Sequence, residues 1–280
     1  MSAIPEIHLE QLIGGYDALL LDAYGVLLDK QGPLPGAVAF IERLHQEGRP
    51  YLVLTNSASR LPETMAAEFA ELGLRIPPER LLCSGMLLGD YFREHGLQGV
   101  PTLVLGPQDA LEYVRRAGGA PLPAGLEDAD AEALVVADQK GFDCLEGMNR
   151  ALDLLIRRLD AGRPLHLLLC NPDLIYPISP GHFGFTAGGL AAMLEAVAQQ
   201  RYPGADHRFI PLGKPHAALF AAARQRLGDR RLAMVGDQPA TDILGANRNG
   251  IDSVLVGSGL ASGAAIPPGM RPSYRLKGFA

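Results

Sequence analysis

The sequence predicts an α/β fold with a mostly parallel sheet. Apolar stretches of strand length alternate with stretches of helical periodicity along almost all of the 280 residues. Runs such as Ala18–Leu21 contain no polar residue, which is typical of a strand buried on both faces. Polar residues that follow such runs would lie at the edge of the sheet where α/β proteins bind ligands. We therefore expect a Rossmann-like, doubly wound core.

The composition describes a globular protein and argues against two kinds of partner. Hydrophobic residues make up 48% of the chain, which is enough for a packed core. The formal net charge of -6 gives no positive surface for nucleic acid. No apolar run is long enough to cross a bilayer, and the first residues do not resemble a signal sequence. We expect no nucleic-acid or membrane partner and a cytoplasmic location.

The three cysteines, Cys83, Cys144 and Cys170, do not suggest a disulfide framework or a zinc site. Their number is odd and their spacing is not that of metal ligands. We expect each to be a small buried hydrophobic residue.

Two polar segments follow the first two predicted strands. Asp22 directly follows the run at 18–21, and Gly25 allows the backbone to turn tightly over a ligand. Thr55, Asn56 and Ser57 follow the strand at 51–54 and precede a helical stretch, which is typical of a helix N-terminus that binds an anion. Taken alone, each segment is equally well explained by a turn or an ordinary helix cap.

Two further segments lie near the other end of the chain. Lys214 is held between Gly213 and Pro215 at the start of an alanine-rich helix, which we expect to have Pro215 in its first turn and to end at Gly228. The strand at 232–235 leads to Asp237, and Asp242 lies in the early turns of the next helix, which begins at Pro239. Taken alone, Lys214 could be solvated and Asp242 could only favour the helix terminus.

Together these segments suit phosphate chemistry. A carboxylate nucleophile needs a divalent cation beside it to offset repulsion from a phosphate, and Mg²⁺ prefers carboxylate, carbonyl and water oxygens. Asp22 and Asp237 would hold the metal, and Asp22 would form an aspartyl-phosphate. The phosphoryl oxygens would be bound by hydroxyl, amide and ammonium groups, namely those of Thr55, Asn56 or Ser57 and of Lys214.

The order and spacing of Asp22, Thr55, Lys214 and the pair Asp237 and Asp242 resemble the four motifs of the haloacid dehalogenase-like hydrolase superfamily. The chain is more narrowly similar to the class IIA branch, which includes 4-nitrophenylphosphatases, pyridoxal phosphate phosphatases and the nucleotide phosphatase of the N-acetylglucosamine operon. Further residues that carry this resemblance are Cys170–Asp173, Gly213–Pro215, Thr241–Ile243 and Leu255–Gly259.

The resemblance implies a division of the chain and a substrate class. Residues 1–100 and 208–280 would form the core, and residues 101–207 an inserted α/β cap that covers the site and selects the substrate. We expect cap strands at 102–105, 134–137 and 165–169, and cap helices at 147–159 and 190–200. The substrate would be a small phosphorylated metabolite. The cofactor would be Mg²⁺, and Asp242 would support the direct metal ligands without binding the ion itself. Caps of this branch often carry a homodimer contact.

The resemblance also implies roles for two cap segments. The turn containing Asn171 and Asp173, and the glycine-rich loop at 181–184 containing His182, would overlook the leaving group. A plain turn explains either segment equally well from the residues alone.

Tyr24 departs from the pattern of the family, whose phosphatases usually have Asp at this position. The backbone carbonyl of Tyr24 would still bind the metal. Its side chain would be a poor general acid, because a phenol titrates near pH ~10. Since a positioned general acid is worth ~10²–10⁴ in rate, we expect a loss of this size on alkyl phosphates and a smaller loss with better leaving groups. His182 is the candidate for a substitute acid.

Two alternative functions remain open. The segment 22–25 also matches the start of true haloacid dehalogenases, in which the aspartate attacks carbon without a metal. Those enzymes insert their cap between the first two motifs, whereas here only 33 positions separate Asp22 from Thr55, and Asp237 and Asp242 are both present. Phosphoryl chemistry is therefore favoured over dehalogenation. A catalytically silent protein that binds phosphorylated ligands is the third possibility.

Overall fold

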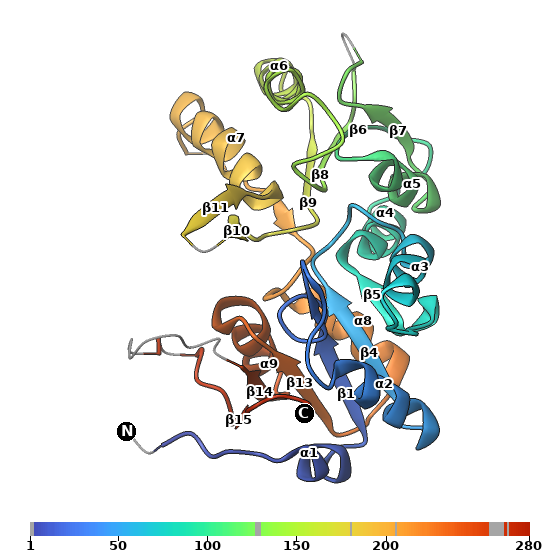
Figure 1. Cartoon of the computed structure of the whole chain (residues 1–280). Coiled ribbons are helices and arrows are strands. Elements are labelled where there is room, and N and C mark those ends of the chain that lie inside the picture. Colours follow the sequence, from blue (N-terminus) through green and yellow to red (C-terminus); the bar gives the residue numbers. More distant parts are fainter. Residues whose placement is uncertain (1–2, 127–129, 180, 205, 258–265, 268) are drawn as a thin grey trace. The chain divides into compact units, whose positions relative to one another are not determined.

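The chain forms two units, which we describe separately (Figure 1). The structure, a computed structural model, describes residues 3–126, 130–179, 181–204, 206–257, 266–267 and 269–280. The first unit contains residues 1–55, 62–82 and 214–280, and the second contains residues 56–61 and 83–213. These bounds differ from the division expected at 101 and 207, because residues 83–100 pack with the second unit. Ser258 and Gly259 lie outside the described residues.

The first unit is built on a six-stranded sheet in the order β15-β14-β13-β1-β4-β5. Its central strand β1 (Ala18–Asp22) pairs in parallel with β13 (Leu232–Gly236) on one side and β4 (Tyr51–Thr55) on the other. Every residue of these three strands is buried, as expected for strands covered on both faces. The outer strands are β5 (Leu81–Cys83), β14 (Asp252–Val256) and β15 (Tyr274–Leu276).

Helices flank this sheet and a small hairpin follows β1 (Figure 1). The helices are α1 (Leu9–Gly15), α2 (Ala37–Gln46), α3 (Pro62–Glu71), η1 (Pro78–Arg80), α8 (Ala217–Leu227), the π-helical turn η3 (Pro239–Ile243) and α9 (Leu244–Arg248). The hairpin pairs β2 (Leu28–Asp29) with β3 (Gly32–Pro33). Helix α9 contacts both α8 and β14. The predicted doubly wound α/β core is confirmed.

The second unit has its own parallel sheet in the order β12-β9-β8-β6-β7. Its strands are β6 (Pro101–Leu105), β7 (Ala120–Pro123), β8 (Ala133–Val136), β9 (His166–Leu169) and β12 (Ile210–Pro211). Its helices are η2 (Ser84–Leu87), α4 (Leu88–Glu94), α5 (Gln108–Arg116), α6 (Cys144–Asp160) and α7 (Ala187–Arg201). Residues of β6, β8 and β9 pack against α6 and α7 in one apolar core. The predicted strands and helices of the insert are therefore present.

Four expectations from the sequence need correction. The glycine-rich segment at 181–184 is not a loop, because its residues from His182 onward form β11 (His182–Phe185), paired with β10 (Ile175–Ser179) in an antiparallel hairpin. Cys144 is exposed, whereas Cys83 and Cys170 are buried as expected. Helix α3 begins only at Pro62, so the residues at 55–57 do not cap it. Helix α8 begins at Ala217, after Pro215.

No helix in the part of the chain that the structure describes is long and apolar enough to cross a bilayer.

Candidate active site

Asp22 stands at the carboxyl end of the central strand of the first unit. The residue is 7% exposed, and β13 and β4 lie on either side of its strand. Gly25 then takes a positive φ of 87° and its N–H donates to the Leu28 carbonyl at 2.8 Å. The chain therefore folds back over the strand end, as Gly25 predicted.

Lys214 lies in the loop before α8 and is almost fully buried. Its Nζ donates to Asp22 Oδ1 at 2.6 Å, to Asp242 Oδ1 at 2.7 Å and to the Leu54 carbonyl at 3.2 Å. An ammonium group rarely enters a protein interior without such partners. The sequence therefore places a fixed positive charge against the predicted nucleophile.

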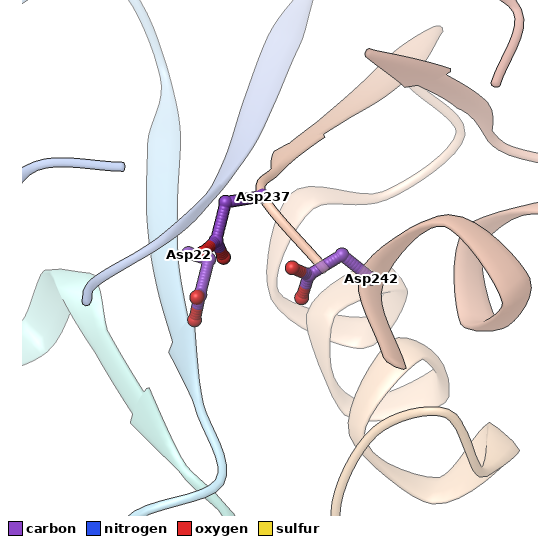
Figure 2. A group of neighbouring side chains, drawn as sticks. All are labelled: Asp22, Asp237 and Asp242. Carbon is purple, nitrogen blue, oxygen red and sulfur yellow. The ribbon is translucent and has the colours of Figure 1, made fainter. Parts of the chain in front are cut away.

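Three carboxylates converge at this point of the sheet. Asp237 directly follows β13, and Asp242 lies in η3, while Figure 2 shows both side chains facing the region of Asp22. One oxygen from each of Asp22, Asp237 and Asp242 lies within 4.8 Å of the others. Such a set of oxygen donors is of the kind that Mg²⁺ prefers. The second oxygen of Asp242 accepts from the Gln238 N–H at 3.1 Å, so both oxygens of Asp242 have protein donors.

Two glycines allow these carboxylates to approach the backbone. A Cβ at Gly25 would overlap the carboxylate of Asp237, and a Cβ at Gly236 would overlap the side chain of Asp242. Any larger residue at either position would displace a carboxylate of the cluster. The glycines thus shape a cradle that suits a small cation close to the main chain.

The charged groups of this cluster shift each other's pKa values. Burial raises the pKa of Asp22 to about 8, while the Lys214 ammonium opposes this rise and the carboxylates of Asp242 and Asp237 add to it. Burial alone would lower the pKa of Lys214, but Asp22 and Asp242 outweigh burial and raise it. Three acidic groups beside one ammonium leave an excess of negative charge, which a divalent cation would offset.

The three polar residues after β4 are divided between the two units. Thr55 ends β4 and is buried, one residue beyond the position that pairs with Asp22. Asn56 belongs to the second unit, where its Nδ2 donates to Asp173 Oδ1 at 3.3 Å. The half-buried Ser57 lies 3.2 Å from Ser59, Oγ to Oγ. The structure thus brings Thr55 to the sheet edge that carries Asp22.

The predicted cap residues form two separate groups within the second unit. Asn171 Oδ1 accepts from the backbone N–H of Asp173 at 3.0 Å, which closes a local turn next to Asn56. His182 is exposed on the β10–β11 hairpin, where its Nδ1 lies 3.2 Å from Ser179 Oγ. The roles of these residues toward a substrate stay predictions.

Tyr24 lies in the turn that leaves Asp22. The residue is 49% exposed, and its backbone pairs with Leu28 in an isolated bridge. This bridge fixes the backbone at position 24, including the carbonyl that was predicted to bind a metal.

Some parts of the cluster were not identified from the sequence. The Leu54 carbonyl and the Gln238 N–H both bind members of the cluster, but main-chain groups leave no signal in a side-chain pattern. The role of Gly236 as the neighbour of Asp242 was equally missed, although a glycine directly before an acidic residue at a strand end is a usable signal.

The fold is an α/β core with an acidic cluster at the carboxyl edge of its sheet. Comparison with known proteins then identifies its kind. The model of the haloacid dehalogenase-like hydrolases matches residues 19–120, and a second model, described as hydrolase-like of the same type, matches residues 211–280. The chain belongs to the haloacid dehalogenase-like hydrolases. The predicted class IIA branch is confirmed as well.

Several relatives match nearly the whole chain. Dihydroxyacetone phosphatase from Corynebacterium glutamicum (strain R) is 28% identical over 249 residues, covering 88% of this chain and 83% of that protein. A possible sugar phosphatase from Cytophaga hutchinsonii has a TM-score of 0.81 and 29% identity, covering 99% of both chains. A glycerol phosphate phosphatase from Mycobacterium tuberculosis in complex with magnesium has a TM-score of 0.76 and 27% identity, covering 96% of this chain and 77% of that one.

Proposed function

We propose that this protein is a Mg²⁺-dependent phosphatase of small phosphorylated metabolites that works through an aspartyl-phosphate on Asp22. The observation that carries the proposal is the contact of one buried ammonium, Lys214, with Asp22 and Asp242, while Asp237 completes a set of three converging carboxylates. The relatives named as phosphatases, one of them solved with magnesium, support the same chemistry.

The side chains of Asp22 and Asp237, with the Tyr24 carbonyl, would hold Mg²⁺. The ion would neutralise phosphoryl charge that otherwise repels the attacking carboxylate. Asp242 would not bind the ion directly, because its two oxygens already accept hydrogen bonds from Lys214 and Gln238. This donor set fits the cation in chemistry and in spacing.

The reaction would proceed in two displacements at phosphorus. An oxygen of Asp22 attacks the phosphorus atom, and the bond to the leaving oxygen breaks with its electron pair going to that oxygen. Water then attacks the phosphorus atom and gives its proton to the solvent, while the bond from phosphorus to the Asp22 oxygen breaks with its electron pair returning to the carboxylate, which releases phosphate. Lys214 orients Asp22 through their 2.6 Å hydrogen bond and keeps positive charge beside the phosphoryl group, while Thr55 is placed at the same edge to donate to it.

The second unit would act as the cap that selects the substrate. In this proposal the second unit provides polar groups toward the substrate, namely those of Asn56, Ser57, Asn171, Asp173 and His182. The leaving group of the substrate would lie next to Tyr24. A homodimer contact through this unit stays a prediction, and analytical ultracentrifugation of the full chain tests it.

Hydrolysis of 4-nitrophenyl phosphate tests the proposal directly. We expect turnover that requires Mg²⁺, stops on addition of EDTA and disappears in Asp22→Asn. Asp153→Asn is the matched control, because Asp153 is exposed on α6 and does not belong to the cluster. It should keep the full rate.

Other outcomes would replace the proposal with one of its alternatives. Release of halide from haloacids that is insensitive to EDTA would indicate attack on carbon. Binding of Mg²⁺ and phosphate without turnover of any of a broad panel of phosphate esters would indicate a silent ligand-binding protein.

A further inference from the structure

The segment 277–280 packs against the end of the loop that follows Asp22, where the loop joins α2. The Phe279 ring stacks on Phe40 of α2, with ring centroids 4.3 Å apart and planes inclined by 12°. Only 7% of Phe279 is exposed. Gly36, at the end of the loop, has a φ of 79°, and a Cβ there would lie 2.6 Å from the backbone nitrogen of Ala280. The segment therefore sits directly on the base of the loop.

Backbone hydrogen bonds close the loop on itself. Leu27 and Leu28 donate to the Ala23 carbonyl, and Leu34 donates to the Leu27 carbonyl at 2.9 Å. At the other end of the loop, Gly25 lies against the Asp237 carboxylate with no room for a Cβ. A displacement at the base of the loop would consequently move Gly25 away from Asp237.

A cavity of about 510 Å³ lies beside the loop. It is lined by loop residues, among them Gly25 and Leu34, by Asp237, and by the segment 277–280. The Phe279 ring stacks on Phe40 of α2 and its backbone lies against Gly36, so Phe279 packs where the loop joins α2, beside a space that holds no packing atoms. Removing the ring would enlarge this space and leave the loop free to move into it.

We propose that Phe279 is a positioning residue for the metal-binding groups. It holds the loop of residues 23–36 so that the Tyr24 carbonyl and the Asp237 carboxylate keep the geometry that binds Mg²⁺. The inference rests on the proposed function, because it concerns the same cation site. The Phe279 ring has no atom that binds Mg²⁺, so its effect would pass through the loop.

Mg²⁺ binding measured by isothermal titration calorimetry tests this role without relying on catalysis. We expect Phe279→Ala to weaken Mg²⁺ affinity by ~10–100-fold, the usual effect of losing a group that orients metal ligands. Phe279→Tyr keeps the stacked ring and should restore most of the affinity. The kcat for 4-nitrophenyl phosphate at fixed Mg²⁺ should fall more than KM rises.

Phe209→Ala provides the matched control. Phe209 is 5% exposed in the apolar core of the second unit, so its truncation should lower the melting temperature while leaving Mg²⁺ affinity unchanged. If the wild-type chain binds Mg²⁺ and Phe279→Ala binds it equally well, the positioning role is wrong. If the wild-type chain binds no Mg²⁺, the proposed function fails together with it.

Discussion

At the scale of single residues, Lys214 is the group on which the cluster depends most. It is the cation that contacts both Asp22 and Asp242, and all three side chains are buried. A buried charge that loses its partner is costly because water no longer compensates it. The same contact orients the predicted nucleophile, so we expect both stability and the proposed catalysis to depend on this side chain.

We therefore predict that Lys214→Met lowers both stability and activity. The free energy of unfolding, measured by urea denaturation without Mg²⁺, should fall by about 3–5 kcal/mol. Lys140→Met, at an exposed position of the second unit, should change it by less than about 0.5 kcal/mol. An equal effect of the two substitutions would show that the buried pairs contribute nothing.

Tyr24 carries the second prediction at this scale. Tyr24→Asp supplies a carboxylic acid beside the leaving group and should raise kcat/KM for an alkyl phosphate such as glycerol phosphate by ~10²–10⁴. Tyr24→Asn has nearly the same size without the acid and should not raise it. If Asn accelerates the reaction as much as Asp, the tyrosine ring merely obstructs the site. If neither variant is faster and both are folded, another acid such as His182 serves the leaving group.

Side-chain chemistry was predictable from the sequence at the strand ends but not beyond them. Asp22 and Lys214 meet as expected because each is held by a short segment next to a buried strand or helix. The contact of Asn56 with Asp173 joins positions 117 apart in sequence, and no local pattern specifies such a pair. Cys144 was expected to be buried, but it opens α6 directly after its N-cap Asp143 and faces solvent.

At the scale of secondary-structure elements, the turn after β1 determines how closely the carboxylates approach the backbone. Gly25 and Gly48 both have positive φ, at 87° and 61°, but only Gly25 is crowded. A side chain at Gly25 would overlap Asp237, whereas none of the surrounding atoms lies within 4 Å of a Cβ at Gly48. The two positions separate the effect of backbone strain from that of displacing the carboxylate.

We predict that Gly25→Ala weakens Mg²⁺ binding at least about tenfold, as expected when a ligand loses its position. Gly48→Ala carries the same kind of backbone strain and should cost stability without changing Mg²⁺ affinity. Calorimetric titration of both variants measures the difference. Equal affinities would mean that the turn does not set the metal geometry.

Elements with a strong apolar period were predicted well, and elements specified by tertiary contacts were not. Strands β1, β4 and β13 and helices α2 and α8 follow from runs and periodicity in the sequence. The start of α3 at Pro62 was missed, because Leu61 donates to Asp109 Oδ2 at 2.9 Å, a partner 48 positions away. The β10–β11 hairpin was missed because its short, glycine-containing strands resemble a loop.

At the scale of the whole molecule, the proposed metal-binding groups belong to one unit. Asp22, Tyr24, Asp237 and Asp242 all lie in the first unit, although the chain leaves that unit directly after Thr55. The boundary was expected near residue 101, but the helices and turns at 83–100 already pack with the second unit. Periodicity identifies elements, whereas their assignment to a unit depends on contacts that periodicity does not encode.

We predict that Mg²⁺ stabilises the two units unequally. A ligand that binds only the native state slows opening of the region that holds it. In hydrogen exchange, backbone amides of β1 and β13 should exchange more slowly when Mg²⁺ is added, while those of β8 should be unchanged. Asp237→Asn should remove the difference. Equal protection of β8 would contradict a site confined to the first unit.

The central claim is that Asp22 accepts the phosphoryl group beside a magnesium ion held by Asp22 and Asp237. A crystal structure with Mg²⁺ and beryllium fluoride, a mimic of the bound phosphoryl group, tests it most directly. We predict the fluoride complex on an Asp22 oxygen, with Mg²⁺ bound by Asp22, Asp237 and the Tyr24 carbonyl. An ion or a fluoride complex bound elsewhere, with Lys214 turned away from Asp22, would contradict the claim.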